Sequence, residues 1–162
     1  MSQRWFDQLC ESAVLDEVLA YVSDGGGVMS GRWGSSTTVL CGAMAIKSAR
    51  HRILVTAHLD QADEAVDELL DMGVAARRFP AMEILPGETG MRSDLLAHRI
   101  STLSQLGKEY SQVLVAPIAA LMQPIPPLAG LDELLRTIVE GESVDRDSLL
   151  AWLDGAGWAR TA

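Results

Sequence analysis

Two short runs of consecutive apolar residues constrain the fold of this chain most strongly. They are Ile53-Leu54-Val55, within HRILVTA, and Val113-Leu114-Val115, within SQVLVA. Runs of this kind are typical of parallel strands that helices cover on both faces. Amphipathic stretches that end at Gly73 and Gly107 separate the runs. Strands that alternate with helices of roughly 10–15 residues imply right-handed βαβ units, so the sequence predicts an α/β fold with a parallel sheet.

The spacing of apolar residues predicts the other helices and strands, and capping residues, glycines and prolines predict where they begin and end. Asp60 and Asp145 are expected to cap the helices that they precede. Helices are expected over residues 5–22, 39–46, 60–73, 93–107 and 145–155, and strands over residues 28–29, 51–57, 74–79, 111–116 and 134–139.

These elements divide the chain into four parts. Residues 1–27 form a helix and a glycine-rich turn, residues 28–123 the α/β domain, residues 124–130 a linker, and residues 131–162 the start of a second domain. The prolines of the linker, PIPPLAG, cannot continue a helix or a central strand. About 30 residues are too few to bury a core of their own. The last part is therefore expected to be a truncated piece of a small α+β domain.

Charge and cysteine usage exclude several classes of function. Thirteen Lys and Arg against 22 Asp and Glu give a formal net charge of −9, which repels phosphate backbones and disfavours binding of nucleic acid. Cys10 and Cys41 form no CxxC motif, which argues against a disulfide framework or a zinc site. No apolar run approaches the ~18 residues of a membrane span, and the N-terminus lacks the apolar core of a signal peptide. We expect a cytoplasmic protein with no membrane partner, no metal and no cofactor.

The stretch GRWGSSTT, residues 31–38, nearly matches a phosphate-binding loop. The Walker A motif requires Gly, four residues, Gly, Lys, and Ser or Thr, and here Ser36 and Thr37 replace the second Gly and the Lys. Thr37 supplies no positive charge to the β and γ phosphates, and Ser36 resists backbone conformations that favour glycine. The degenerate loop comprises Gly31, Gly34, Ser35, Ser36, Thr37 and Thr38.

The sequence offers no recognisable catalytic group. A partial Walker match favours a strand-to-helix turn over a nucleotide site, and Trp33 beside it is expected to be a packing residue. The basic clusters Arg77-Arg78 and His98-Arg99 are expected to be exposed or paired with carboxylates. Glu83 and Glu88 flank a turn, but no nucleophile or base is recognisable beside them. The sequence therefore predicts that the chain is not an enzyme.

From Gly31 to its C-terminus the chain resembles a known family. The order is GRWGSSTTVL, HRILVTA, FPAMEILPGETGMRSDLLAHRISTLSQL, QVLVAPIAALMQPIP and RDSLLAWLDGAGW. This order looks like the N-terminal UvrB-homology module of the bacterial transcription-repair coupling factor, Mfd, and MEILPGE and DLLAHRISTLSQL are its most specific parts. The resemblance implies a P-loop-NTPase-like sheet, similar to the first domain of the UvrB helicase, followed by the start of a second domain.

The resemblance also implies a function without catalysis. In the family the phosphate loop of this module is degenerate and hydrolyses no nucleotide, while the DNA translocase motor lies further along the polypeptide. The module imitates UvrB, so that UvrA docks on its second domain and excision repair is recruited to a stalled polymerase. The best-known docking residues follow the segment equivalent to GAGW. This chain is therefore expected to bind UvrA weakly or not at all, with Arg146 and Arg160 as candidate peripheral contacts. RNA polymerase and DNA are expected to bind only other regions of the full-length proteins.

Two other classes of function stay open. A small P-loop enzyme would bind ATP despite Thr37. A doubly wound domain would bind another small ligand in a polar cleft near residues 31–36 and 86–90. The strand expected over residues 134–139 would leave an unpaired edge, which predicts self-association.

Overall fold

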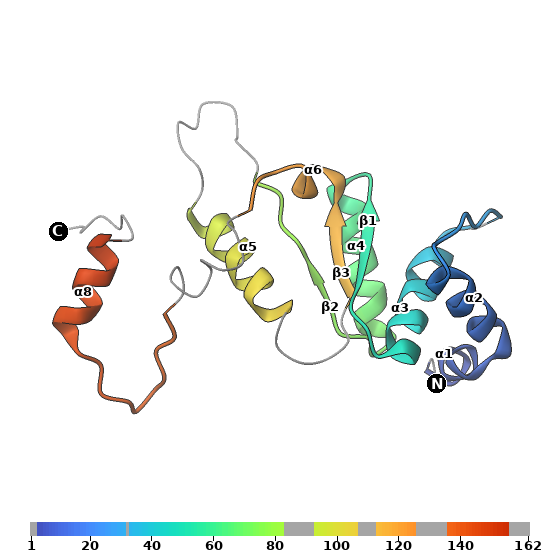
Figure 1. The fold of residues 1–162 in the computed structure, drawn as a ribbon, viewed down its shortest axis with the longest axis horizontal. Helices are drawn as coiled ribbons and strands as arrows, with labels where there is room; N and C mark the ends of the chain where they lie inside the picture. Colours follow the sequence, from blue (N-terminus) through green and yellow to red (C-terminus); the bar gives the residue numbers. More distant parts are fainter. Residues whose placement is uncertain (1–2, 32, 83–92, 107–112, 126–135, 156–162) are drawn as a thin grey trace. The chain divides into compact units, whose positions relative to one another are not determined.

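The computed structural model describes residues 3–31, 33–82, 93–106, 113–125 and 136–155 (Figure 1). The chain divides into two compact units, Met1–Pro124 and Ile125–Ala162. The described residues contain the helices α1 (Gln3–Glu11), α2 (Ala13–Ser23), α3 (Ser36–Ser48), α4 (Leu59–Asp71), α5 (Ser93–Leu106), α6 (Ile118–Leu121) and α8 (Arg146–Gly155), and the strands β1 (Arg52–Thr56), β2 (Ala76–Arg78) and β3 (Val113–Pro117). The division into four parts expected from the sequence remains a prediction.

The three strands form one parallel sheet in the order β1-β3-β2. Arg52 of β1 and Ala76 of β2 both align with Val113 of β3. The two apolar runs of the sequence are therefore neighbouring strands, and β3 lies between two partners. Every residue of β3 is buried, which explains why its sequence shows no alternation of apolar and polar residues.

Helices cover both faces of β3. The chain passes from β1 to the far strand β2 and then returns to the centre, so right-handed connections place α4 and α5 on opposite faces. Val113 and Val115 belong to a core cluster that includes Leu69 of α4. Their neighbours Leu114 and Ala116 belong to a second cluster, against which Leu103 and Leu106 of α5 pack. The predicted α/β fold with a parallel sheet is confirmed.

The cover over β1 is less complete than its sequence predicts. Leu54 packs against the first core cluster, whereas Ile53 and Val55 are exposed on the other face. β1 is an edge strand, since only β3 pairs with it in the described sheet. The run Ile53-Leu54-Val55 is therefore covered on one face, and the expectation of two covered faces is wrong here.

Helices α1, α2 and α3 extend the first cluster. Phe6 of α1 and Leu15 of α2 are fully buried in it. Gly42 of α3 sits so close to α4 and its following turn that an added Cβ would lie 2.8 Å from Cδ2 of Leu69 and 3.2 Å from Cγ2 of Val74. The missing side chain lets α3 approach α4 closely.

The N-terminal segment contains two helices where the sequence predicts one over residues 5–22. Ser12 separates α1 from α2. Its hydroxyl donates to the carbonyl of Leu9 (2.8 Å) and accepts the N–H of Leu15 (3.3 Å). A serine hydroxyl competes in this way with the backbone bonds of a helix, and Ser12 therefore caps a new helix.

Two expected strands are wrong in the described residues. Val28 and Met29 form no strand, and Val28 is 95% exposed. Gly25, Gly26 and Gly31 around them have φ values of 128°, 90° and 78°, which turn the chain away from an extended course. Residues 136–139 also form no strand. The third strand of the sheet is instead β2, within the expected strand over residues 74–79.

One of the two predicted helix caps is confirmed. The carboxylate of Asp145 accepts the N–H groups of Asp147 and Ser148, each at 3.3 Å. Asp60 does not hold the cap position of α4, because the helix begins one residue earlier than expected, at Leu59. His58 precedes it, and its N–H donates to Oε1 of Gln61 (3.4 Å).

The second unit is described over residues 125 and 136–155. Arg136 donates to the carbonyl of Ser148 in α8 (3.2 Å), and α8 has no buried residue. The small α+β domain expected here remains a prediction. Across both units, no described helix is long and apolar enough to cross a membrane.

Candidate functional site

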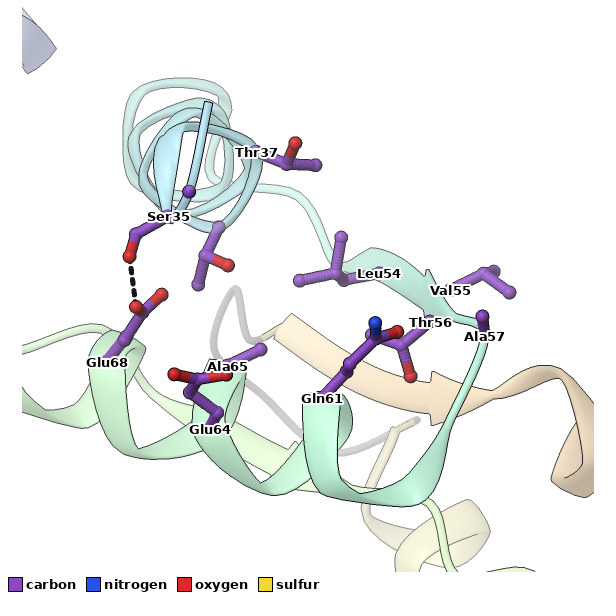
Figure 2. Close-up of a pocket in the computed structure, with 12 residues that line it drawn as sticks. Ser35, Thr37, Leu54, Val55, Thr56, Ala57, Gln61, Glu64, Ala65 and Glu68 are labelled. Carbon is purple, nitrogen blue, oxygen red and sulfur yellow. Dashed lines mark hydrogen bonds between the residues drawn. The ribbon is translucent and has the colours of Figure 1, made fainter. Parts of the chain in front are cut away.

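A depression of about 470 Å³ lies at the N-terminal end of α3 (Figure 2). The first turn of α3, the carboxyl end of β1 and one side of α4 surround it. Its lining residues are Gly34, Ser35, Thr37, Thr38, Leu54, Val55, Thr56, Ala57, Gln61, Glu64, Ala65 and Glu68. Open α/β sheets bind ligands at this position, outside the carboxyl ends of their strands.

The turn before α3 is closed by its own backbone and a serine. Gly34 has a φ of +51°, a left-handed conformation that suits glycine. The N–H of Trp33 donates to Oγ of Ser36 (3.1 Å), and the N–H of Ser36 donates to the carbonyl of Trp33 (3.2 Å). The turn therefore leads tightly into α3, and it lacks the second glycine and the lysine of a working phosphate loop.

A carboxylate from α4 reaches the N-terminal end of α3. The hydroxyl of Ser35 donates a hydrogen bond to Oε1 of Glu68, and Figure 2 shows Glu64 one turn earlier on the same helix. The close approach of α3 to α4 at Gly42 brings these groups together. A helix N-terminus attracts negative charge, because its first N–H groups have no partner within the helix. Glu68, which accepts a hydrogen bond from the hydroxyl of the cap residue Ser35, places a negative charge beside this helix end.

The charge of the depression opposes a phosphate. Glu64 and Glu68 are its two ionisable lining residues, and no Lys or Arg is among the described residues that line it. The hydroxyls of Ser35, Thr37 and Thr38 add polar but neutral groups. The described part of the chain also contains no group of three or more His, Cys, Asp and Glu side chains that could hold a metal ion.

The structure brings most of the predicted loop residues together. Gly34, Ser35, Thr37 and Thr38 line the depression, and Ser36 closes the turn. Gly31 lies at the start of the loop, with a φ of +78°.

Trp33 is not the packing residue that the sequence predicts. Its side chain is 88% exposed. The turn that Ser36 closes holds the Trp33 backbone, while the side chain stays out of the core.

The other predicted contacts lie elsewhere. Arg146 is the exposed first residue of α8, in the second unit. Arg160, Glu83 and Glu88 lie outside the described residues. Arg78 forms an ion pair with Asp63 at 3.0 Å, as expected for this basic cluster.

Contrary to the sequence prediction for its cluster, Arg99 is neither exposed nor paired with a carboxylate of the described residues. It is buried and donates hydrogen bonds to carbonyl groups. Its side chain is 1% exposed, and its guanidinium lies 4.3 Å from the centre of the Phe79 ring. Nη1 donates to the carbonyls of Pro80 (2.7 Å) and Ala120 (3.3 Å) and to Oε1 of Gln123 (3.2 Å). Burial lowers the pKa of Arg99 from its ordinary value, but a guanidinium stays charged in proteins.

Sequence reasoning missed two features, and each left a signal. Arg99 lies three residues after Leu96 and four before Leu103, on the apolar side of its helix, and that position indicates burial. Glu64 and Glu68 have helical i, i+4 spacing, which places them on one side of α4. Their contact with the turn before α3 depends on tertiary packing and has no signal in the local sequence.

Comparison with known proteins gives two matches. The transcription-repair-coupling factor of Bacillus subtilis (strain 168) is 26% identical over 137 residues, which is 83% of this chain and 12% of that protein. The transcription-repair-coupling factor of Escherichia coli (strain K12) is 27% identical over 127 residues, which is 77% of this chain and 11% of that protein. This chain is similar to transcription-repair coupling factors. The resemblance inferred from the sequence is thus confirmed.

The similarity to the coupling factors covers most of this chain but a small part of its relatives. The chain spans 12% and 11% of the length of these two proteins. No family model matches the chain. No solved structure matches it either.

Proposed function

We propose that this chain is a non-catalytic module of a protein of the transcription-repair coupling kind, in which a degenerate phosphate loop has become a structural turn. The observation that supports this proposal is the carboxylate of Glu68 at the N-terminal end of α3. In a working loop, the backbone N–H groups at this helix end bind a phosphate. Here an internal carboxylate lies at that end.

Charge gives the proposal its physical basis. Two unit charges about 4 Å apart interact by about 4 kcal/mol at an effective dielectric constant of about 20. A triphosphate in the depression would be repelled by Glu68 and, with more screening by solvent, by the exposed Glu64. Thr37, at the position of the Walker lysine, provides no positive charge to offset it. Binding of ATP is therefore opposed by two neighbouring charges and assisted by none among the described lining residues.

We further propose that the module helps to recruit UvrA to a stalled RNA polymerase during nucleotide excision repair in the cytoplasm. The support is the similarity to two transcription-repair-coupling factors, together with the function that the family resemblance implies. Arg146 and Arg160 are the candidate peripheral contacts in the second unit. RNA polymerase and DNA would bind to other regions of the longer proteins.

Surface plasmon resonance against immobilised UvrA tests this function. Residues 1–162 are expected to bind more weakly than the whole Bacillus subtilis coupling factor, with a further loss on Arg146→Glu or Arg160→Glu. Equal affinity would place the main docking residues within residues 1–162 and contradict a peripheral role. Absence of binding by both proteins would contradict recruitment of UvrA.

A second candidate function rests on the depression itself. Its volume of about 470 Å³ and its place at the carboxyl end of β1 suit a small ligand of another class. A thermal-shift panel of nucleotides and of neutral and cationic metabolites separates the two functions. A saturable increase in melting temperature that Glu68→Ala abolishes would favour ligand binding over a purely structural turn.

A further inference from the structure

Helix α2 and the segment that follows it form an apolar groove of about 280 Å³. Its walls share no residue with the depression at the N-terminal end of α3. Figure 1 shows the chain leaving α2 as a projecting loop before it reaches α3. The apolar residues of the groove are Val14, Val18, Tyr21, Val22, Val28 and Met29.

The groove residues form a second apolar stripe on α2. Leu15 is buried in the core and Leu19 packs against it, so the helix already has a covered face. Val14, Val18 and Tyr21 follow one another at i, i+4 and i+7, the spacing of a separate helical stripe. Val14 is 66% exposed and Tyr21 is 62% exposed. These side chains are exposed and line one groove, and clustered exposed apolar side chains mark interaction sites.

Gly27 shapes one wall of the groove. A Cβ added at Gly27 would lie 1.8 Å from Cε1 of Tyr21. Only a residue without a side chain lets the tyrosine ring lie against this segment. Any larger residue at position 27 must push the ring from its place. The shape of the groove therefore depends on Gly27 and Tyr21 together.

The groove has one acidic wall residue, and the sequence around it is acidic. Between residues 7 and 31 the sequence has no Lys or Arg, and its acidic residues there are Asp7, Glu11, Asp16, Glu17 and Asp24. Glu17 lines the groove directly. Asp16 pairs with Lys47 of α3 at 2.9 Å, so these two charges offset each other and Glu17 is the acidic group at the groove. The groove therefore favours an occupant that carries positive charges beside its own apolar side chains.

We propose that this groove binds an amphipathic helix of a partner protein that carries lysines or arginines beside its apolar face. A groove along an apolar stripe accepts a helix through side chains spaced at i, i+4 and i+7. Tyr21 and Met29 are of the residue types enriched in protein interfaces. Charge selects this occupant over the others: nucleic acid and acidic membranes are repelled by Glu17 and the net charge of −9, and a second copy would bring the same charges.

The probe is a fluorescein-labelled helical peptide of about 16 residues, long enough to hold a helix when bound. It carries leucines on one face and lysines on both sides of that face. A scrambled peptide of the same composition and a leucine–glutamate peptide are its controls. Anisotropy is expected to give saturable binding of the leucine–lysine helix alone. Tyr21→Ala should weaken binding at least about tenfold and Glu17→Lys several-fold.

Matched variants on α4 separate the groove from general acidity. Leu70→Ala removes another exposed apolar side chain, and Asp67→Lys makes the same charge reversal away from the groove. Both should leave affinity within about twofold of the unchanged protein. Gly27→Ala displaces the tyrosine ring without deleting it and should also weaken binding. Chemical-shift changes in ¹⁵N spectra should fall on residues 14–29.

Three results would overturn the proposal. The first is equal binding of the scrambled peptide, which would mean attraction by net charge alone. The second is a set of shift changes centred on Glu64 and Glu68. The third is a dimer in sedimentation experiments that Tyr21→Ala dissociates, since the occupant would then be a second copy of this chain.

Discussion

The hydroxyl of Ser35 donates a hydrogen bond to the carboxylate of Glu68. This bond joins the turn before α3 to α4, and it brings a negative charge to the helix end that favours one. The approach of α3 to α4 at Gly42 makes the contact possible. An incoming phosphate would therefore compete with a carboxylate that is already in place.

Repair of the degenerate motif tests the part that Glu68 plays. Ser36→Gly with Thr37→Lys restores the Walker pattern between Gly31 and Thr38. This double variant is expected to bind ATP weakly, because Glu68 still repels the phosphates. Adding Glu68→Gln should raise affinity at least about tenfold, which corresponds to about 1.4 kcal/mol, measured by titration calorimetry.

Asp67→Asn is the control for this repair. It removes the same charge from α4 at a position that does not line the depression. In the double variant it should change ATP affinity less than Glu68→Gln does. Equal gains from both would show that overall charge, and not the carboxylate at the end of α3, limits binding.

Gly42→Ala is expected to destabilise the protein. Alanine would normally favour a helix by about 1 kcal/mol over glycine. Here its Cβ would lie 2.8 Å from Cδ2 of Leu69, a fully buried side chain. Overpacking of this kind costs typically 1–3 kcal/mol, so the free energy of unfolding should fall. Urea denaturation measures it, and a gain in stability would show that α3 and α4 are not closely packed.

Arg99→Met should lower the free energy of unfolding by roughly 2–4 kcal/mol, because the buried carbonyls of Pro80 and Ala120 would lose a donor. Arg99→Lys should be intermediate, since an ammonium does not reproduce the planar array of donors. Arg77→Met, at an exposed position of β2, should stay within about 0.5 kcal/mol. Similar losses for Arg99→Met and Arg77→Met would contradict a structural network at Arg99.

Much of the fold follows from local sequence, and the exceptions have physical causes. The runs Ile53-Leu54-Val55 and Val113-Leu114-Val115 are continuous and apolar, which predicts strands, and they pair with each other in the sheet. Val28-Met29 is apolar as well, but its glycine neighbours and lack of a pairing partner leave it outside the sheet.

In the candidate site too, local sequence predicts some features and tertiary packing decides the others. The loop is recognisable in the sequence because Gly31 and Thr38 keep the spacing of a known motif. The contribution of Glu68 depends on where α4 packs, which no local pattern encodes. The prediction that Arg99 is exposed or paired with a carboxylate failed for another reason. Basic residues are usually solvated, and only the position of Arg99 on the apolar side of α5 indicates burial.

The two cysteine thiols should react slowly with iodoacetamide. Burial raises the pKa of Cys41. Burial is also the main cause that raises the pKa of Cys10, and the nearby carboxylate of Asp7 is the second. The rate of alkylation against pH should therefore have its midpoint above that of free cysteine. Denaturation in urea should return the midpoint to the ordinary value. A midpoint at or below that of free cysteine would contradict the buried positions.

The raised thiol pKa values also set the sign of a pH effect on stability. The folded protein holds these protons more tightly than the unfolded chain does. Their contribution to the free energy of unfolding is fully present below the unfolded pKa of about 8.5 and is lost as pH rises through the folded value. Replacing both residues, Cys10→Ser and Cys41→Ala, should remove this alkaline dependence in urea denaturation.

Titration of the unmodified chain with Mg-ATP tests the central claim most directly, because the account depends on an internal carboxylate that already lies beside the N-terminal end of α3. Calorimetry should show no saturable binding at millimolar ATP, and a phosphate-release assay should show no turnover above background. Saturable binding, or turnover that Thr38→Ala abolishes, would contradict the claim and identify the loop as a working nucleotide site.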